Sequence, residues 1–395
     1  VATTLIFLGL LGRTPDSDGL AFWSAEIGEG RTIDSVVSDV MTAPEYIARF
    51  PGPPTLETEV VASNLTIPWD IETLPDGTVV FTERTGAIKV IADGTVRDLD
   101  ADFSGAFIQG ETGVMGLAVD PGFNSNRRIY VCQGNSAPRE IRVVVWMIDS
   151  TLTTATEVGP LVTGMPIGSG RHGGCQLEFG SDGYLYVATG DAATGTVPQN
   201  LASLGGKVLR VDAATGEGAA GNPFADSSNA DTRRIFTYGH RNVQGLSARP
   251  GTNEMWSVEH GPRVDDEINR LRSGGNAGWN PVPGYNESVP MTDVSLPDAM
   301  PAAWSTGSPT LALSGGEFFD DRAWGSWNGG LAVAALKNQT LRLLFFNPDG
   351  LYLGQTTVID GEFGRRRSVH QADDGSVYVS TSRGNDDIVR LMPAP

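Results

Sequence analysis

The segment from Tyr238 to Leu246 combines several groups that can do chemistry. It reads Tyr-Gly-His-Arg-Asn-Val-Gln-Gly-Leu, so an imidazole, a guanidinium and an amide follow one another directly. Glu-His-Gly-Pro begins at Glu259 and Asp-Asp-Glu-Ile-Asn begins at Asp265. Cationic and amide donors favour an anionic ligand, whereas acidic side chains and loop carbonyls are the oxygen donors that hard cations prefer. The spacing therefore predicts a pocket for an anion that is held together with a divalent metal.

The composition favours a globular protein made of many short strands. The chain has 395 residues, of which 40% are hydrophobic, with 50 glycines and 24 prolines. Such frequent turn-forming residues suit strands joined by tight turns. The formal net charge of −19 argues against nucleic acid as a partner, because phosphate binding needs a basic surface. No apolar run of about 18 residues is present, so no membrane span is expected.

The two cysteines, Cys132 and Cys175, leave two interpretations open. They are either two buried small side chains or, if the protein is exported, a disulfide. Metal binding by the pair is not expected, because no further cysteine and no Cys-x-x-Cys spacing accompanies them.

Residues 1–50 differ in pattern from the remainder of the chain. Apolar residues recur at helical spacing between Leu5 and Met41, with breaks at residues 14–16 and 28–30. We predict a small helical domain here. The run from Leu11 to Tyr46 resembles part of a helical domain of unknown function found on secreted bacterial proteins. Residues 51–57, which are rich in proline, are the predicted linker.

Residues 58–395 have the pattern of an all-β domain. Short apolar strands alternate with glycine-containing turns, and Asp-Gly precedes such a strand at Gly77, Gly183 and Gly375, with a fourth copy at Gly350. Recurrence of one hairpin unit indicates radial repetition, as in a β-propeller. At about 40–50 residues for each blade, the length allows six to eight blades.

Several blocks in this region match a known family in order. They are Pro68–Asp70 with Leu74–Gly77 and Thr82–Gly86, Gly113–Leu117 with Asp120–Phe123, His172–Gly174 with Phe179–Asp191, Gly206–Arg210 with Gly221–Phe224, the opening run through Gly275–Trp279, and the weaker Arg365–Val369. Over about residues 58–392 the chain resembles the soluble quinoprotein sugar dehydrogenases, which are the aldose and glucose/sorbosone dehydrogenases that use pyrroloquinoline quinone (PQQ). The resemblance implies a six-bladed β-propeller behind the short N-terminal α-helical segment.

The resemblance also implies an activity. Such an enzyme uses PQQ and Ca²⁺, oxidises aldose sugars to lactones and passes the electrons to an external acceptor. No Cys-x-x-Cys-His haem motif is present, so the acceptor is expected to be a separate molecule. An acidic surface suits a secreted or periplasmic protein of this kind.

The catalytic residues that the resemblance implies are His172, Arg241 and Glu111. His172 matches the base that takes the proton of a sugar hydroxyl, which requires a neutral imidazole. Arg171 precedes it where the best-known glucose-oxidising branch has an acid, so the group that orients the imidazole is left open. Arg241 would stabilise the reduced, more anionic cofactor. Glu111 is expected near quinone and substrate, where it accepts a sugar hydroxyl or assists His172.

The cofactor ligands that the resemblance implies are mostly cationic, as the three carboxylates of PQQ require. Asn242 joins Arg241 at the quinone, Lys337 matches a carboxylate ligand, and Thr310 aligns with a hydroxyl contact. Arg365 and Arg367 match a pair beside the cofactor, and their i, i+2 spacing places both on one face of a strand, with Arg366 on the other.

The metal ligands that the resemblance implies are backbone carbonyls at Gly261 and Pro262, with Ca²⁺ as the metal. Hard cations bind oxygen, and a loop carbonyl provides it without adding charge. The acids at 265–267 are either turn and surface residues or part of a second Ca²⁺ site, for which Glu267 is the best candidate. His240 is expected to be structural, Trp69 to lie in the core, and Trp279 is left open as a residue that stacks on sugar.

Two other functions stay open. A Ca²⁺-dependent propeller hydrolase, such as a sugar lactonase, would use the metal and the acids but would not need Lys337, Arg365 and Arg367. A cofactor-free propeller that binds carbohydrate or protein would not need His172 and Arg241 together.

Overall fold

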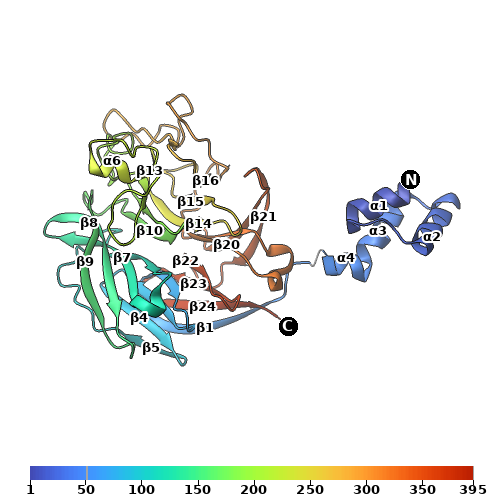
Figure 1. Cartoon of the computed structure of the whole chain (residues 1–395), viewed down its shortest axis with the longest axis horizontal. Helices are drawn as coiled ribbons and strands as arrows, with labels where there is room; N and C mark the ends of the chain where they lie inside the picture. Colours follow the sequence, from blue (N-terminus) through green and yellow to red (C-terminus); the bar gives the residue numbers. More distant parts are fainter. Residues whose placement is uncertain (50–51, 395) are drawn as a thin grey trace. The chain divides into compact units, whose positions relative to one another are not determined.

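The computed structural model describes residues 1–49 and 52–394, and its N-terminal part is helical (Figure 1). The helices are α1 (Ala2–Leu11), α2 (Ser17–Gly28), α3 (Ile33–Thr42) and α4 (Pro44–Arg49). Asp16 and Thr32 cap α2 and α3 by accepting hydrogen bonds from the backbone N–H groups of Gly19 and Ser35. The predicted boundary between helices and linker falls on residues 50 and 51, which lie outside the described residues.

The chain divides into two compact units, one built on residues 1–56 with 321–328, and the other on residues 57–320 and 329–392. The helical unit has a core of its own, formed by Ile6, Phe7, Leu11, Val36 and Val40. Strand β1 (Leu56–Leu65) begins inside the range predicted as linker. None of the described helices is long and apolar enough to cross a bilayer.

The larger unit is a six-bladed β-propeller, as the sequence predicted. Each of its six sheets has four strands. Strand β1 from the start of the propeller pairs with β24 from its end, which closes the ring and leaves no open edge between first and last blade. The first blade contains β2 (Pro68–Thr73), β3 (Val79–Glu83), β4 (Ala87–Ala92) and β5 (Thr95–Asp98), and the second contains β6 (Val114–Val119), β7 (Arg128–Ser136), β8 (Arg139–Ile148) and β9 (Ala155–Met165). The third contains β10 (Gly174–Phe179), β11 (Leu185–Thr189), β12 (Lys207–Val211) and β13 (Ile235–Tyr238), and the fourth contains β14 (Val243–Ala248), β15 (Met255–Glu259), β16 (Glu267–Arg270) and β17 (Trp304–Ser305). The fifth contains β18 (Leu313–Phe318), β19 (Leu331–Ala335), β20 (Thr340–Phe346) and β21 (Tyr352–Asp360), and the sixth contains β22 (Arg366–Gln371), β23 (Val377–Thr381), β24 (Asp386–Pro393) and β1. Short helices α5 (Phe123–Asn126), α6 (Ala230–Arg234) and η1 (Arg322–Trp327) lie between strands.

The Asp-Gly turns mark hairpins but do not all mark the same hairpin. Gly77, Gly183 and Gly375 have φ between 79° and 84° and each joins the first and second strands of its blade. Gly350, with φ 83°, joins the third and fourth strands, β20 and β21. Any tight hairpin needs a residue that tolerates positive φ, so the turn motif predicts hairpins without fixing their place in the blade.

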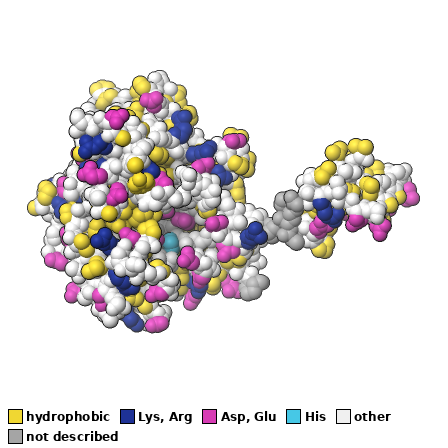
Figure 2. Space-filling model, viewed as in Figure 1, with side chains coloured by type: hydrophobic (Ala, Val, Ile, Leu, Met, Phe, Trp, Pro, Cys, Tyr) yellow, Lys and Arg dark blue, Asp and Glu magenta, His cyan; other side chains and the backbone are white. Residues whose placement is uncertain are grey.

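The first strand of each blade lines the central axis, and neighbouring first strands contact one another around the ring. Between the second and third blades, Cys132 of β7 and Cys175 of β10 form a fully buried disulfide with a Cα–Cα distance of 5.7 Å. The disulfide settles the question that the sequence left open. It also fixes the start of β10, three residues after His172, to the neighbouring blade. Figure 2 shows acidic and basic side chains dispersed over one face of the propeller.

Candidate active site

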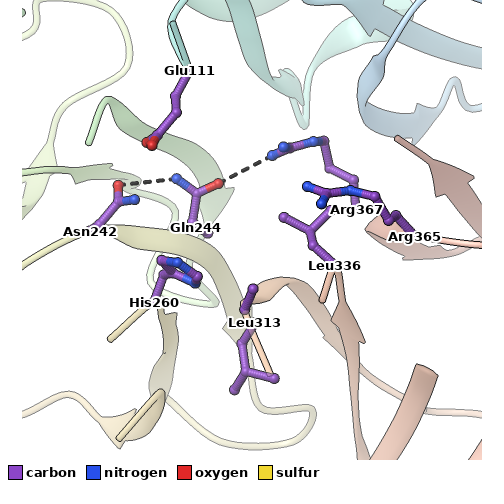
Figure 3. A pocket seen from close by; sticks show the side chains of 9 residues that line it. Glu111, Asn242, Gln244, His260, Leu313, Leu336, Arg365 and Arg367 are labelled. Carbon is purple, nitrogen blue, oxygen red and sulfur yellow. Dashed lines mark hydrogen bonds between the residues drawn. The ribbon is translucent and has the colours of Figure 1, made fainter. Parts of the chain in front are cut away.

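A cavity of about 170 Å³ opens where the first strands of several blades begin. Figure 3 shows its lining side chains converging from β14, β18 and β22 and from the loops beside them. The lining residues are Glu111, Asn242, Gln244, His260, Ala312, Leu313, Leu336, Arg365 and Arg367. The propeller thus brings together residues that are more than 250 positions apart in the sequence.

His172 is held in a buried position just before β10, with 2% of its surface exposed. Its backbone has a positive φ of 56°, and a Cβ atom at Gly190 would overlap its carbonyl oxygen. Its Nδ1 lies 2.8 Å from Oδ1 of Asp191. Because a carboxylate only accepts, this contact fixes the tautomer with the proton on Nδ1. Nε2, which has no partner among the described residues, keeps its lone pair for a base.

Asp191 is the group that orients the imidazole, which the sequence had left open. It is fully buried. Its Oδ2 accepts hydrogen bonds from the indole N–H of Trp279 at 2.8 Å and from the hydroxyl of Tyr285 at 2.7 Å. The Tyr285 hydroxyl also lies 2.9 Å from His172 Nδ1. Trp279 is itself fully buried, which argues against the sugar-stacking role that the sequence left open.

Glu111 bonds to the backbone of His172 and also lines the cavity. Its Oε2 accepts a hydrogen bond from the backbone N–H of His172 at 2.9 Å, and the side chain lines the cavity. Its own backbone N–H donates to the carbonyl of Gly170. The carboxylate therefore holds the backbone on which the imidazole is mounted.

Arg241 is a buried cation at the edge of the cavity, with 2% of its surface exposed. Nη1 donates to the carbonyl of His260 at 2.8 Å and Nη2 donates to Glu287 at 2.7 Å. Nε is buried and has no acceptor among the described residues. A buried donor without an acceptor is costly, so an oxygen of a bound ligand would stabilise Arg241, although Arg241 is not itself one of the residues that line the cavity.

Asn242 and Gln244 form a short chain of amides along β14. The Oδ1 of Asn242 accepts from the backbone N–H of Gly174 at 3.0 Å and from Nε2 of Gln244 at 3.1 Å. The Oε1 of Gln244 accepts from Arg367 at 3.2 Å. The two amides thus connect Gly174, close to His172 in the chain, to Arg367; Figure 3 shows the bonds from Asn242 through Gln244 to Arg367. His240 does not face the cavity, because Glu259 and Thr237 hold its two ring nitrogens at 2.8 Å each.

The arginine triplet divides between two environments. Arg365 and Arg367 line the cavity, whereas the buried Arg366 donates to the backbone carbonyls of Gln339, Glu362 and Gly364. Arg367 also lies over Trp69, with 5.5 Å from Cζ to the ring centroid. Burial, reinforced by the charges of Arg84 and Arg365, lowers the pKa of Arg367 to about 10, so it stays cationic at neutral pH. The buried Trp69 belongs to the core, as predicted.

Lys337 and Thr310 do not line this cavity, although their neighbours Leu336 and Ala312 do. The Lys337 side chain is exposed and Thr310 is buried. Lys337 still acts on the site, because its charge is one of those that lower the pKa of His260. Burial is the main cause of that shift, followed by Arg241, and the pKa falls to about 3. His260 is therefore neutral.

The Gly261–Pro262 turn is held by a buried acid. Asp266 is fully buried and accepts from the backbone N–H groups of Gly261 at 2.9 Å, Leu311 at 2.6 Å and Ala312 at 2.8 Å. Over the described residues, no three His, Cys, Asp or Glu side chains are grouped as metal ligands. A metal at this turn would therefore need backbone oxygens and oxygens of a bound ligand.

Glu267 lies apart from the cavity lining. It is 3% exposed, its Oε1 accepts from Thr292 at 2.8 Å, and its Oε2 is buried without a partner among the described residues. Burial raises its pKa to about 8, with a further contribution from Glu259. The buried oxygen is thus satisfied by a proton or by a cation.

Fold and site together define a six-bladed propeller with an imidazole–carboxylate pair beside a pocket lined with arginines. The chain belongs to the glucose/sorbosone dehydrogenase family, whose model matches residues 65–390. It is 29% identical over 364 residues to the aldose sugar dehydrogenase YliI of Escherichia coli strain K12, covering 88% of this chain and 95% of that protein.

Solved structures of aldose sugar dehydrogenases superimpose on this chain. The apo soluble aldose sugar dehydrogenase of Escherichia coli superimposes with a TM-score of 0.78 at 27% identity, covering 86% of this chain and all of that one. The PQQ-bound aldose sugar dehydrogenase of Streptomyces coelicolor superimposes with a TM-score of 0.72 at 25% identity, covering 86% and 99%.

Sequence reasoning missed several residues of this site. Asp191 closes one of the matched blocks, Val-Ala-Thr-Gly-Asp after a strand, so its place at a strand end was a usable signal. Gln244 and His260 lie inside matched segments but were not assigned. Tyr285 and Glu287 lie in the long connection between β16 and β17, where no motif marks them.

Proposed function

We propose that the protein is a PQQ- and Ca²⁺-dependent aldose dehydrogenase that passes its electrons to an external acceptor. The observation that carries the proposal is that two unlike features lie next to each other, connected by Glu111, which bonds to the backbone of His172 and lines the cavity. A buried base with an oriented imidazole, His172 with Asp191, lies beside a group of arginines in a protein of net charge −19. An acidic protein gathers cations in this way for an anionic ligand.

The residues present fit a tricarboxylate quinone. Arg365 and Arg367 would pair with its carboxylates, and Asn242 would meet its quinone oxygens from the cavity wall. Arg241, whose Nε has no acceptor among the described residues, would contact the same oxygens. Lys337 and Thr310 are proposed as further ligands from the segments that flank the cavity. PQQ supplies an electrophilic carbonyl that accepts the hydride of a sugar carbon. The backbone carbonyls of Gly261 and Pro262 are proposed to hold Ca²⁺, with Glu267 as a ligand of a second ion.

His172 performs the proton transfer. Its Nε2 takes the proton from the sugar hydroxyl while the C–H electron pair leaves the same carbon, so the aldose becomes a lactone. Asp191 stabilises the imidazolium that forms, and Trp279 and Tyr285 prevent Asp191 from turning away. Arg241 stabilises the negative charge that develops in the pocket. Glu111 keeps the backbone of His172 in place.

We propose that the protein works outside the cytoplasm, because disulfides persist in oxidising compartments and Cys132–Cys175 is formed. The competing lactonase function leaves Arg365 and Arg367 without a role.

The test is cofactor binding followed by turnover. We expect apo protein to bind PQQ with Ca²⁺ at micromolar or lower concentration and to reduce an electron-acceptor dye when an aldose is added. His172→Ala should keep PQQ but lose about 10²- to 10⁴-fold in dye reduction, whereas Arg367→Gln should lose PQQ affinity. Lactone hydrolysis without PQQ binding would replace the dehydrogenase by the hydrolase.

A further inference from the structure

Glu287 connects two arginines that flank the base. Its Oε1 lies 2.6 Å from Nη2 of Arg171 and 2.7 Å from Nη2 of Arg241. Arg171 directly precedes His172 in the chain, and Arg241 lies at the edge of the cofactor pocket. Glu287, from the long connection between β16 and β17, therefore bridges the residue that precedes the base and the buried Arg241.

The position of Glu287 is fixed by its own loop. Two residues earlier, the Tyr285 hydroxyl bonds to Asp191 and lies against His172. The backbone N–H of Asn286 donates to the carbonyl of Pro281 at 2.8 Å, and Met291 is buried. The loop is thus fixed by contacts on both sides of Glu287, and these contacts keep the carboxylate between Arg171 and Arg241.

Glu287 is charged. Burial alone would raise its pKa, but the hydrogen bond from Arg241 and the charge of Arg171 keep the pKa below its usual value. Its side chain is 27% exposed, so part of the Glu287 side chain is accessible to a ligand.

We propose that Glu287 makes this site select neutral aldoses over sugar acids. The inference rests on the proposed function for the identity of the ligand as a sugar. A neutral aldose can donate a hydroxyl to the carboxylate, whereas the carboxylate of a uronic acid meets a like charge. Glu287 also occupies the guanidinium groups of Arg171 and Arg241, which would otherwise receive a substrate carboxylate.

The test compares glucose with glucuronate in Glu287→Gln, which keeps the shape and removes the charge. We expect the ratio of kcat/KM for glucuronate to that for glucose to rise roughly 5- to 20-fold, as one charge within several ångströms predicts. At about 0.5 M salt the gain should shrink, because mobile ions screen it. Arg171→Gln should move the ratio in the opposite direction. The binding ratio of the two sugars is measured in parallel by calorimetry.

The matched control is Asp293→Asn, which removes one negative charge from the same loop. The carboxylate of Asp293 bonds only to Ser295 among the described residues, so the ratio should not change. An unchanged ratio in Glu287→Gln, whether or not PQQ affinity falls, would overturn the proposal. If no variant reduces the dye with any sugar, the dehydrogenase function fails, while the calorimetric ratio still decides the role of Glu287.

Discussion

The Nδ1 of His172 is held by hydrogen bonds, and this leaves Nε2 available to act as the base. Nδ1 contacts both Asp191 at 2.8 Å and Tyr285 at 2.9 Å, so the ring cannot present its protonated side to a substrate. Asp191 in turn receives two further donors, from Trp279 and Tyr285. The base is therefore oriented by a buried network in which every contact lies within normal hydrogen-bond distance.

Replacing Asp191 by Asn should separate orientation from binding. The amide NH₂ of Asn would face the N–H of Trp279 and the O–H of Tyr285, which are also donors. The amide would then turn or donate to the imidazole, so the proton on Nδ1 of His172 would no longer be fixed. We expect kcat with PQQ and an aldose to fall about 10²- to 10⁴-fold. The dissociation constant of PQQ, measured by titration in the same buffer, should stay within about threefold. A parallel loss of cofactor affinity would mean that Asp191 only supports the pocket wall.

At the scale of single elements, Lys207 fastens the segment that carries Asp191. It is fully buried on β12, and its Nζ donates to the carbonyls of Val197 at 3.0 Å, Pro198 at 2.9 Å and Gly205 at 2.6 Å. Three donors matched to three carbonyls hold the long loop between β11 and β12 against the blade. A residue with no contribution to the chemistry thus shapes the active site.

Lys207→Met should destabilise the protein by about 2–4 kcal/mol, because buried carbonyls lose their donors. Urea unfolding at pH 7 measures the change. Lys337→Met is the control: the Lys337 side chain is exposed, so its replacement should change the stability by about 0.5 kcal/mol or less. Equal costs for the two variants would contradict the role of Lys207.

The sequence predicted elements better than contacts. The first blade shows this: the Asp-Gly turn at Gly77 predicts a strand directly after it, and β3 begins at Val79, because apolar runs and glycine turns are local signals. Tyr285 and Glu287 could not be found in this way. They reach the site through a loop without periodicity, and only the closed ring determines which loops meet.

At the scale of the whole molecule, the first strands of the blades also place several carboxylates close together along the central axis, away from the candidate active site. Glu72, Glu178 and Glu317 come from alternate blades, on β2, β10 and β18, and with His370 of β22 they line a second cavity of about 110 Å³. Asp70 lies nearby on β2, fully enclosed, and accepts from Gln176 and Ser368. Burial raises the pKa of Asp70 to about 7.

Burial also raises the pKa of Glu178, with Asp70 adding to the shift, and that of Glu317 and Glu72, which the neighbouring carboxylates reinforce. His370 cannot compensate them, since burial lowers its pKa to about 4. A carboxyl group whose pKa is raised by folding is at no disadvantage below its unfolded pKa. As the pH rises from about 4.5 towards 8, the unfolded chain releases these protons freely and the folded one does not, so stability falls.

Glu178→Gln should therefore stabilise the protein at pH 8 and have little effect at pH 4.5. We expect a gain on the order of 1–2 kcal/mol at the higher pH, measured by urea unfolding. Glu59→Gln, at an exposed position on β1, is the matched control and should give the same small change at both pH values. If Glu178→Gln instead lowered stability at pH 8, the three glutamates would be held in their charged form by a bound cation, and the pH argument for the axis would be wrong.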